Sequence, residues 1–211
     1  AYRPQRKTQR PRIHGTQTAL VTGKAGEEIW TDEFGRVKVQ FHWDREGQKD
    51  ENTSCWVRVA QGWAGKSWGT WCLPRIGMGV VVTCLEGDPD SQLITGCVYN
   101  GEQVQPYTLP DDQTKATMKS NSSKGGNGYN EFRFEDLAGK EEIFLHAQKD
   151  WNSVVENART TTVKDDDDTV TIEKGNRIFE VQTGDETHSV KGDRKLTVNG
   201  SQTHKTDNGF T

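Results

Sequence analysis

The feature that most restricts the fold of this chain is an eight-residue repeat in its polar C-terminal part. Glycines and valines spaced by eight mark the repeat: Gly184, Gly192 and Gly200, with the pairs Val155 and Val163, and Val190 and Val198. The spacing slips once, where Gly175 stands one residue early. Self-similarity at a short fixed period is typical of solenoids and β-helices. We therefore expect each octad to form one short strand and one turn, with the glycine at the turn.

One chain of this composition cannot enclose a core by itself. Each octad offers about two inward-facing apolar side chains, whereas ordering its residues costs roughly 1.5 kcal/mol each. Three chains wound together form a triangular prism, in which the apolar side chains meet on the axis and every strand edge is paired. We expect the core of this homotrimer to contain Val155, Val163, Val190, Leu196 and Val198. The alternative is a disordered, low-complexity polar tail.

Five strand-like segments occupy the first half of the chain and are separated by Gly, Asp and Asn turns. They cover residues 16–22, 36–43, 55–60, 79–85 and 93–99. Five short strands with such turns are typical of a small closed barrel of the OB type. Six of the seven Trp residues lie in the first third of the chain, which favours an ordinary packed domain there.

The predicted organisation has four parts: an N-terminal extension (1–15), an OB-fold-like barrel (16–101), a linker (102–129) and a trimeric β-helix (130–211). The linker is rich in Pro, Asp, Ser, Asn and Gly, and the β-helix opens with a hairpin-like pair over 130–136 and 142–147. Helix signals are nearly absent, and only 151–159 has the composition for a turn or two. The predicted fold class is all-β: an OB-fold-like five-stranded barrel followed by an intertwined trimeric β-helix.

The composition argues against several classes of protein. A net charge of -4 gives no electrostatic basis for binding nucleic acid. No apolar run approaches the length of a membrane span, and the basic stretch 3–12 lacks the apolar core of a signal peptide. The chain starts without Met, so we expect it to be a fragment of a longer protein. The four cysteines (Cys55, Cys72, Cys84 and Cys97) have no CxxC spacing, which predicts reduced core thiols rather than a zinc site.

No catalytic constellation stands out, so we expect neither an enzyme nor a cofactor. His42 lies in a predicted strand without an acid–base partner. The carboxylates of Glu86, Asp88 and Asp90 lie in a turn sequence, and Ser67 lacks the glycine spacing of a phosphate loop. The acidic run 165–168 is interpreted as a solvated turn rather than a cation site, because consecutive carboxylates cannot all face one ion.

Two further features leave alternatives open. His188 and His204 are two octads apart, so they are expected at equivalent positions of the prism. We interpret them as outward, solvated side chains, and no metal is predicted; the alternative is an axial ring of three imidazoles at each level. Trp63 and Trp68 lie in a glycine-rich loop, where they either stack on a sugar or pack against a neighbouring subunit.

Several motifs in order carry a resemblance to a known family. They are 32–39, 56–59, 73–82, 85–90 and 95–100 in the barrel, and 130–136 and 145–150 at the entry to the β-helix. These segments resemble the central region of VgrG proteins, the valine–glycine repeat spikes of type VI secretion systems, although the large N-terminal hub of that family is missing. Alternative identities are the spike of a contractile phage tail and a carbohydrate-binding module.

The resemblance implies a structural and not an enzymatic role. A homotrimer would sit on the tip of a secreted tube and would puncture a target cell envelope when the sheath contracts, which is a virulence function. The implied partners are a tube (Hcp-like) protein, a tip-capping (PAAR-like) protein, secreted effectors and, transiently, the target membrane. The protein would be made in the cytoplasm without a signal peptide and exported by the type VI apparatus to the extracellular space or the target cell.

Overall fold

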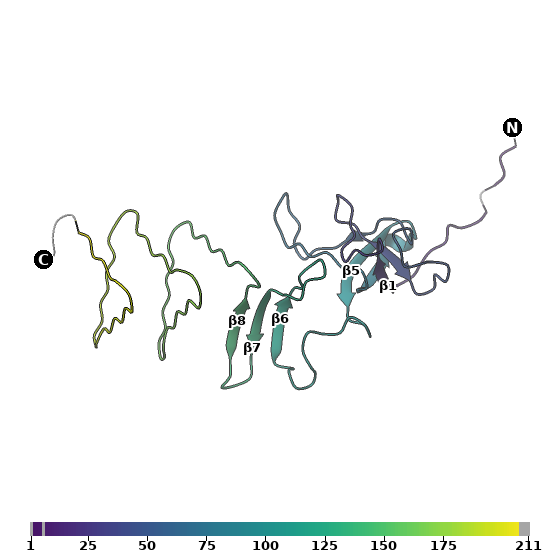
Figure 1. Cartoon of the computed structure of the whole chain (residues 1–211). Coiled ribbons are helices and arrows are strands. Elements are labelled where there is room, and N and C mark those ends of the chain that lie inside the picture. The colour runs from purple at the N-terminus through teal and green to yellow at the C-terminus, as the bar shows by residue number, and fades with distance from the viewer. Residues whose placement is uncertain (1, 6, 207–211) are drawn as a thin grey trace. The chain divides into compact units, whose positions relative to one another are not determined.

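The computed structural model describes residues 2–5 and 7–206 and consists of strands, turns and extended segments (Figure 1). It divides into two compact units, one ending at Ser153 and one beginning at Val154. The described residues contain one short helical element, the 3-10 turn η1 (Leu85–Gly87). The all-β class predicted from the sequence is therefore confirmed. Residues 151–159, where the composition allowed a helical turn or two, are not helical, as expected for a stretch without an amphipathic face to dock.

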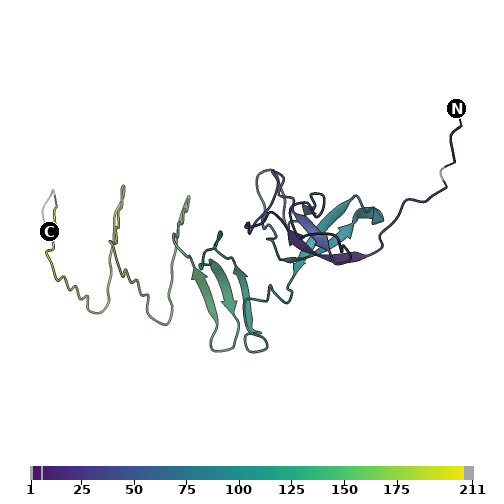
Figure 2. The ribbon, with the colours of Figure 1, turned by 45° about the vertical axis from the view of Figure 1, so that its right-hand side comes forward.

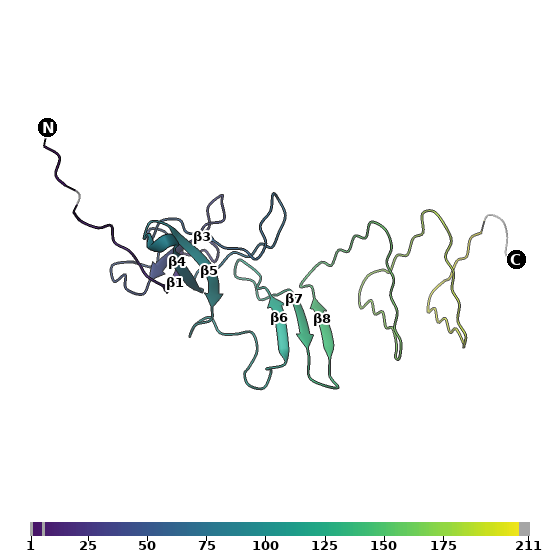
Figure 3. The ribbon, with the colours of Figure 1, turned by 180° about the vertical axis from the view of Figure 1, so that it is seen from behind.

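The first sheet is a curled five-stranded sheet with the order β2-β1-β4-β5-β3. Its strands are β1 (Thr16–Thr22), β2 (Lys38–Phe41), β3 (Arg58–Val59), β4 (Gly79–Cys84) and β5 (Gln92–Val98). Just outside β2 and β3, the amides of Val37 and Val57 donate to each other's carbonyls at 3.0 and 2.8 Å. This bridge joins the two ends of the sheet and curls it around its core, as an OB-type barrel requires. Figure 3 shows β3 beside β5, its parallel partner.

The core inside this sheet is built almost entirely from small and β-branched apolar side chains. Its buried members are Ala19, Val21, Val37, Val39, Phe41, Val57, Val80, Val82 and Ile94. In β1 and β2 the buried residues alternate with less buried ones, as expected where one sheet face meets a core and the other meets solvent.

The tryptophans, whose clustering favoured a packed domain here, do not build its core. Trp43, Trp63, Trp68 and Trp71 are all more than half exposed. The narrow interior of a small barrel is filled by valines, and the large indoles are left on connecting loops.

The cysteines also differ from the expectation of core thiols. All four are free, but Cys55, Cys72 and Cys97 are exposed and Cys84 is only half-buried. Cys97 lies in the second half of β5, past an irregularity in the β4–β5 register between Val81 and Val82. Every residue of that half of the strand is exposed, so the apolar neighbours of Cys97 in sequence do not form a core around it.

A second, three-stranded antiparallel sheet follows, with the order β6-β7-β8. Its strands are β6 (Lys115–Lys119), β7 (Glu131–Glu135) and β8 (Glu142–His146), and Figure 1 shows them side by side. The hairpin expected from the sequence is confirmed, and its turn is closed by the Lys140 amide donating to the Leu137 carbonyl at 2.8 Å. Strand β6 lies inside the stretch 102–129 that was expected to be a linker. Its segment is too short and polar to be recognised as a strand from its own sequence, and pairing with β7 orders it.

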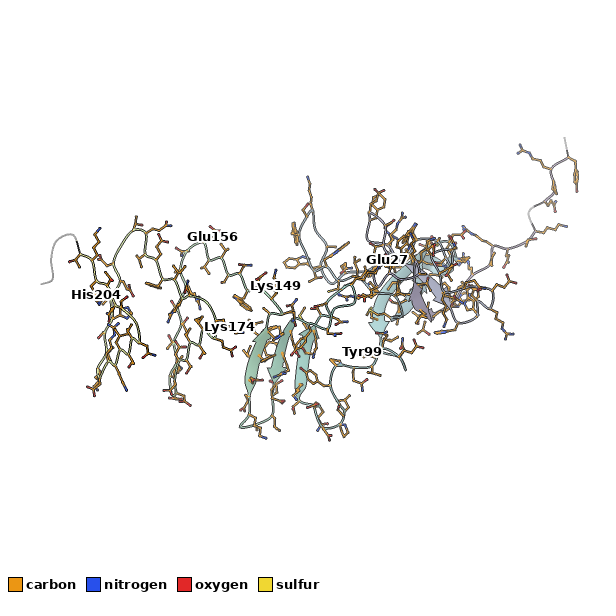
Figure 4. The ribbon with its side chains drawn as sticks, viewed as in Figure 1. Glu27, Tyr99, Lys149, Glu156, Lys174 and His204 are labelled. Atoms are coloured by element: carbon orange, nitrogen blue, oxygen red, sulfur yellow. The ribbon has the colours of Figure 1, made fainter. Side chains whose placement is uncertain are left out.

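The β6–β7 connection is anchored to the five-stranded sheet at two acidic residues. Lys124 pairs with Glu27 at 2.9 Å, and the amide of Gly125 donates to the Glu28 carboxylate at 2.8 Å (Figure 4 labels Glu27). Hydrogen bonds from Ser123 and from the Gly125 amide hold the pKa of Glu28 below its usual value. The second sheet is thus attached to the barrel by side-chain contacts as well as by the chain itself.

The unit from Val154 onward contains turns and extended segments but no strand among residues 154–206. Figures 1 and 2 show it running back and forth in successive extended stretches. Within these residues no hydrogen bond joins one backbone segment to another. An extended chain needs a neighbouring strand for its backbone groups, and a single copy of this repeat provides none.

Candidate trimer interface

The three-stranded sheet has an apolar face that nothing covers in the single chain. Cross-strand pairing places Met118 beside Phe132, and Phe132 beside Leu145. The next row joins Ala116, Phe134 and Ile143. Met118 and Ile143 are 73% and 69% exposed, and the other large side chains of this face are also exposed. We name these six residues the apolar face; contiguous surfaces of this kind usually mark an interface.

The opposite face of the same sheet is polar and is covered by the chain that precedes it. Glu131 is buried, with 3% of its surface exposed. The hydroxyls of Tyr107 and Thr117 donate to its carboxylate, the latter at 2.9 Å, and the ammonium of Lys119 lies 3.5 Å away. Arg133 donates to the Tyr107 hydroxyl at 3.1 Å. This arrangement inverts the usual amphipathic sheet, since the carboxylate of Glu131 is enclosed on the charged face while the apolar face is open.

The charges on the polar face are balanced by these contacts. Burial by itself raises the pKa of Glu131, but the hydrogen bonds from Tyr107 and Thr117 and the positive charges of Lys119 and Arg133 outweigh it and hold the pKa below its usual value. Hydrogen bonds to Tyr107 and Glu142 raise the pKa of Arg133 still further, so its charge is permanent. Most hydrogen-bonding groups of the polar face are therefore satisfied within one chain, and the exception is the buried Nε of Arg133, which has no hydrogen-bond partner.

The predicted trimer-core residues of the repeat are likewise unburied in one chain. Val155, Val163, Val190, Leu196 and Val198 are between 45% and 60% exposed. Between the two valine pairs, five further apolar residues are exposed that the repeat analysis did not single out: Val170, Ile172, Ile178, Phe179 and Val181. Four of the five lie off the register of eight set by Val155 and Val163, whereas Phe179 lies on it, two octads after Val163.

The repeat glycines are not alike in backbone conformation. Gly184 has a φ of +111°, where a side chain would be strained, whereas Gly192 and Gly200 are not among the positive-φ residues. A Cβ added at any of the three would meet nothing within 4 Å in the single chain. Of these three glycines only Gly184 has a positive φ, and Gly175, which stands one residue early in the repeat, also has one, at +100°.

The other candidate site residues do not come together into a chemical centre. His188 and His204 are exposed; His188 pairs with Glu186, and His204 contacts Gln202 (Figure 4 labels His204). His42 and Ser67 are exposed. Within the described residues, no cluster of three or more His, Cys, Asp or Glu side chains could hold a metal ion.

The carboxylates at 86–90 form a docking point for the N-terminal extension instead of an acid–base pair. Arg10 lies 2.9 Å from Asp88 and 2.7 Å from Asp90, and the amide of Ile13 donates to the Gly87 carbonyl.

The described residues include no helix of the length and apolarity needed to span a bilayer.

Comparison with known families assigns both halves of the chain. Residues 21–99 match the family described as the type VI secretion system/phage-baseplate injector OB domain. Residues 116–210 match the bacteriophage T4 gp5 C-terminal trimerisation domain. The second match begins in β6 and therefore includes the whole apolar face together with the repeat.

Individual proteins similar to this chain carry related names. The chain is 56% identical over 168 residues to the type VI secretion system spike protein VgrG1b of Pseudomonas aeruginosa, covering 79% of this chain and 23% of that protein. It is 55% identical over 155 residues to VgrG1a of the same organism, covering 72% of this chain and 24% of that protein. It is 46% identical over 183 residues to the actin cross-linking toxin VgrG1 of Vibrio cholerae, covering 87% of this chain and 16% of that protein. The chain thus spans less than a quarter of the length of these relatives.

Proposed function

Since the chain belongs to the VgrG family of type VI secretion system spike proteins, we propose that it forms part of a homotrimeric spike that punctures a cell envelope and carries effectors at the tip of a secreted tube. The observation that carries this proposal is the surface that one chain leaves open. The apolar face of β6–β8 and the repeat valines are exposed in a segment that matches a trimerisation domain. Two further copies provide the missing partner for both.

The proposed spike gains its stiffness from the way each chain completes the others. Val155, Val163, Val190, Leu196 and Val198 form the core of the needle, and Gly184, Gly192 and Gly200 form its turns. Backbone groups that have no partner in one chain pair with the neighbouring chains, so a compressive force along the axis is distributed over many hydrogen bonds. The polar side chains between these valines then face water.

The domain boundaries that fit this proposal are those inferred from the sequence, with one change. The extension covers 1–15, the barrel 16–101 and the needle the residues up to 211. The segment 102–129 is better described as a collar than as a linker, because it contains β6 and the Tyr107 contacts. The apolar face is then the point at which the three chains first meet.

We propose that this part of the protein has no catalytic activity. Two of the relatives compared are named spike proteins, and the toxin from V. cholerae shares only 16% of its length with this chain. An enzymatic segment, where a family member has one, would be an additional domain that the spike carries. His188 and His204 are proposed to remain solvated, without a metal on the axis.

The partners proposed for the assembled spike are a tube (Hcp-like) protein, a tip-capping (PAAR-like) protein and secreted effectors, with transient contact to the target membrane and none to nucleic acid. The protein would be made in the cytoplasm and released by the type VI apparatus. The names of the relatives support this route.

A secretion assay with a matched pair of variants tests the proposal. The full-length protein carrying Val190→Asp and Val198→Asp should disappear from the culture medium together with the tube protein, because charges on the axis prevent trimer assembly. Lys191→Ala, which changes a polar position of the same repeat, should be secreted normally. Equal secretion of both variants, or secretion that does not depend on the sheath, would contradict the spike function.

A further inference from the structure

A hairpin that projects from the barrel is exposed along its length, and near its base the ring of Trp71 lies against Gly35. Every residue from 62 to 72 is exposed. The hairpin is nevertheless ordered by its own hydrogen bonds: the Gln61 side chain forms two 3.0 Å bonds with the backbone of Cys72, and the Thr70 amide donates to the Trp63 carbonyl at 2.9 Å. An isolated two-stranded hairpin is marginally stable in water, so this one is expected to have a partner.

Two indoles are fixed on this hairpin in a defined geometry. The rings of Trp63 and Trp68 meet edge to face, with centroids 4.9 Å apart and an interplanar angle of 81°. Trp68 lies over Gly65, where an added Cβ would come within 2.2 Å of the ring. Trp63 remains 63% exposed and Trp68 57% exposed. The pair is therefore preorganised but largely unburied, which is the pattern of an aromatic anchor at an interface.

The base of the hairpin lies beside the part of the barrel that contacts the trimerisation domain. The chain leaving the hairpin reaches Ile76, whose amide donates to the Glu28 carbonyl at 3.0 Å. The Glu28 carboxylate in turn accepts from the amide of Gly125, and Lys124 pairs with Glu27. Gly125 and Lys124 fall within residues 116–210, the match to the trimerisation domain. These contacts link the chain that leaves the hairpin to the β6–β7 connection, which lies within the matched trimerisation domain.

We propose that the Trp63–Trp68 hairpin of each chain packs against a neighbouring copy of the same chain and so fixes the barrels around the needle. This inference rests on the proposed trimeric spike. A sugar fits the hairpin less well, because two perpendicular rings offer no flat platform and carbohydrate sites need several converging polar side chains. A neighbouring chain is already held close by the trimerisation domain, which reduces the entropy lost in forming the contact.

Photo-cross-linking within the assembled chain tests the contact. The photoreactive residue p-benzoylphenylalanine is placed at position 68, and at position 43 as the control. Trp43 is 63% exposed, like Trp63, but stacks on Phe41 of its own barrel. Mixed trimers of normal and ¹⁵N-labelled chains distinguish bonds between chains from bonds within one. We expect position 68 to give cross-linked peptides that join two differently labelled copies, and position 43 to give none.

The outcomes separate this inference from the proposed function. A trimer whose position 68 cross-links only within its own chain, or not at all, overturns the hairpin contact while leaving the spike intact. In the full-length protein, a cross-link from position 68 to a segment outside residues 1–211 also overturns it, as does protection of the hairpin by soluble peptidoglycan fragments. A chain that sediments as a monomer overturns both. As a second measurement, Trp63→Ser with Trp68→Ser should keep the trimer but abolish amide-exchange protection over 61–72.

Discussion

Truncation of Ile143 to alanine should weaken the trimer far more than it weakens one chain. Ile143 is 69% exposed on the apolar face, so most of its burial must come from assembly. Truncation of a fully buried isoleucine to alanine costs about 2–5 kcal/mol. Because most of the burial of Ile143 comes from assembly, about 2–3 kcal/mol of this cost per chain falls on the trimer. Because each trimer contains three copies, the loss is about 6–9 kcal/mol per trimer, which raises the concentration at half-dissociation by about two to three powers of ten.

Sedimentation equilibrium over a concentration series measures this shift, and Val104→Ala provides the control. Val104 is 66% exposed, has a similar branched side chain and lies outside the matched trimerisation domain. Circular dichroism verifies that both variants keep their β-structure. If Ile143→Ala and Val104→Ala dissociate at the same concentration, the apolar face is not part of the interface and the reasoning fails.

Three further predictions concern the polar face and the repeat. Glu131→Gln should lower the melting temperature more than Glu142→Gln, because the Glu131 substitution leaves Lys119 without its charge partner beside a buried side chain, at a cost of about 1–3 kcal/mol. Equal melting temperatures of the two variants would count against that network. Because the folded-state pKa of Glu131 lies below its usual value of 4.5, its stabilisation is complete above that pH and is lost as the pH falls through the folded pKa. The difference in melting temperature between the wild type and Glu131→Gln should therefore shrink on acidification, and a constant difference would refute this origin. Gly184→Ala should destabilise the repeat by about 1–3 kcal/mol because of its positive φ, whereas Gly192→Ala should cost less; chemical denaturation compares them, and the reverse order would contradict the turn assignment.

The barrel was predictable because its strands follow simple local rules. The segment 16–22 was expected as a strand and is one, with the same ends, since alternation and a flanking glycine define it. The clustering of the tryptophans favoured a packed domain, but composition indicates that a side chain is apolar and not where it lies. Trp63 and Trp68 were placed in a glycine-rich loop from the sequence, and the structure has both on an exposed hairpin.

The interface was only half predictable, for a different reason. The valine spacing identified a surface that one chain cannot bury, and the β7–β8 hairpin was visible as alternation. Strand β6 was not, because Lys115–Lys119 holds only Ala116 and Met118 as apolar residues, and its pairing with β7 depends on a partner separated from it by a loop. The buried position of Glu131 was also hidden, since the Tyr107 that covers it comes from a segment with no strand pattern.

The mass of the assembled chain in solution tests the central claim most directly. Light scattering on the purified chain should give three times the 23.7 kDa of one copy, and the value should persist on dilution into the micromolar range. A stable, folded species of 23.7 kDa would mean that the apolar face and the repeat valines are tolerated in water without partners, and that result would contradict the account.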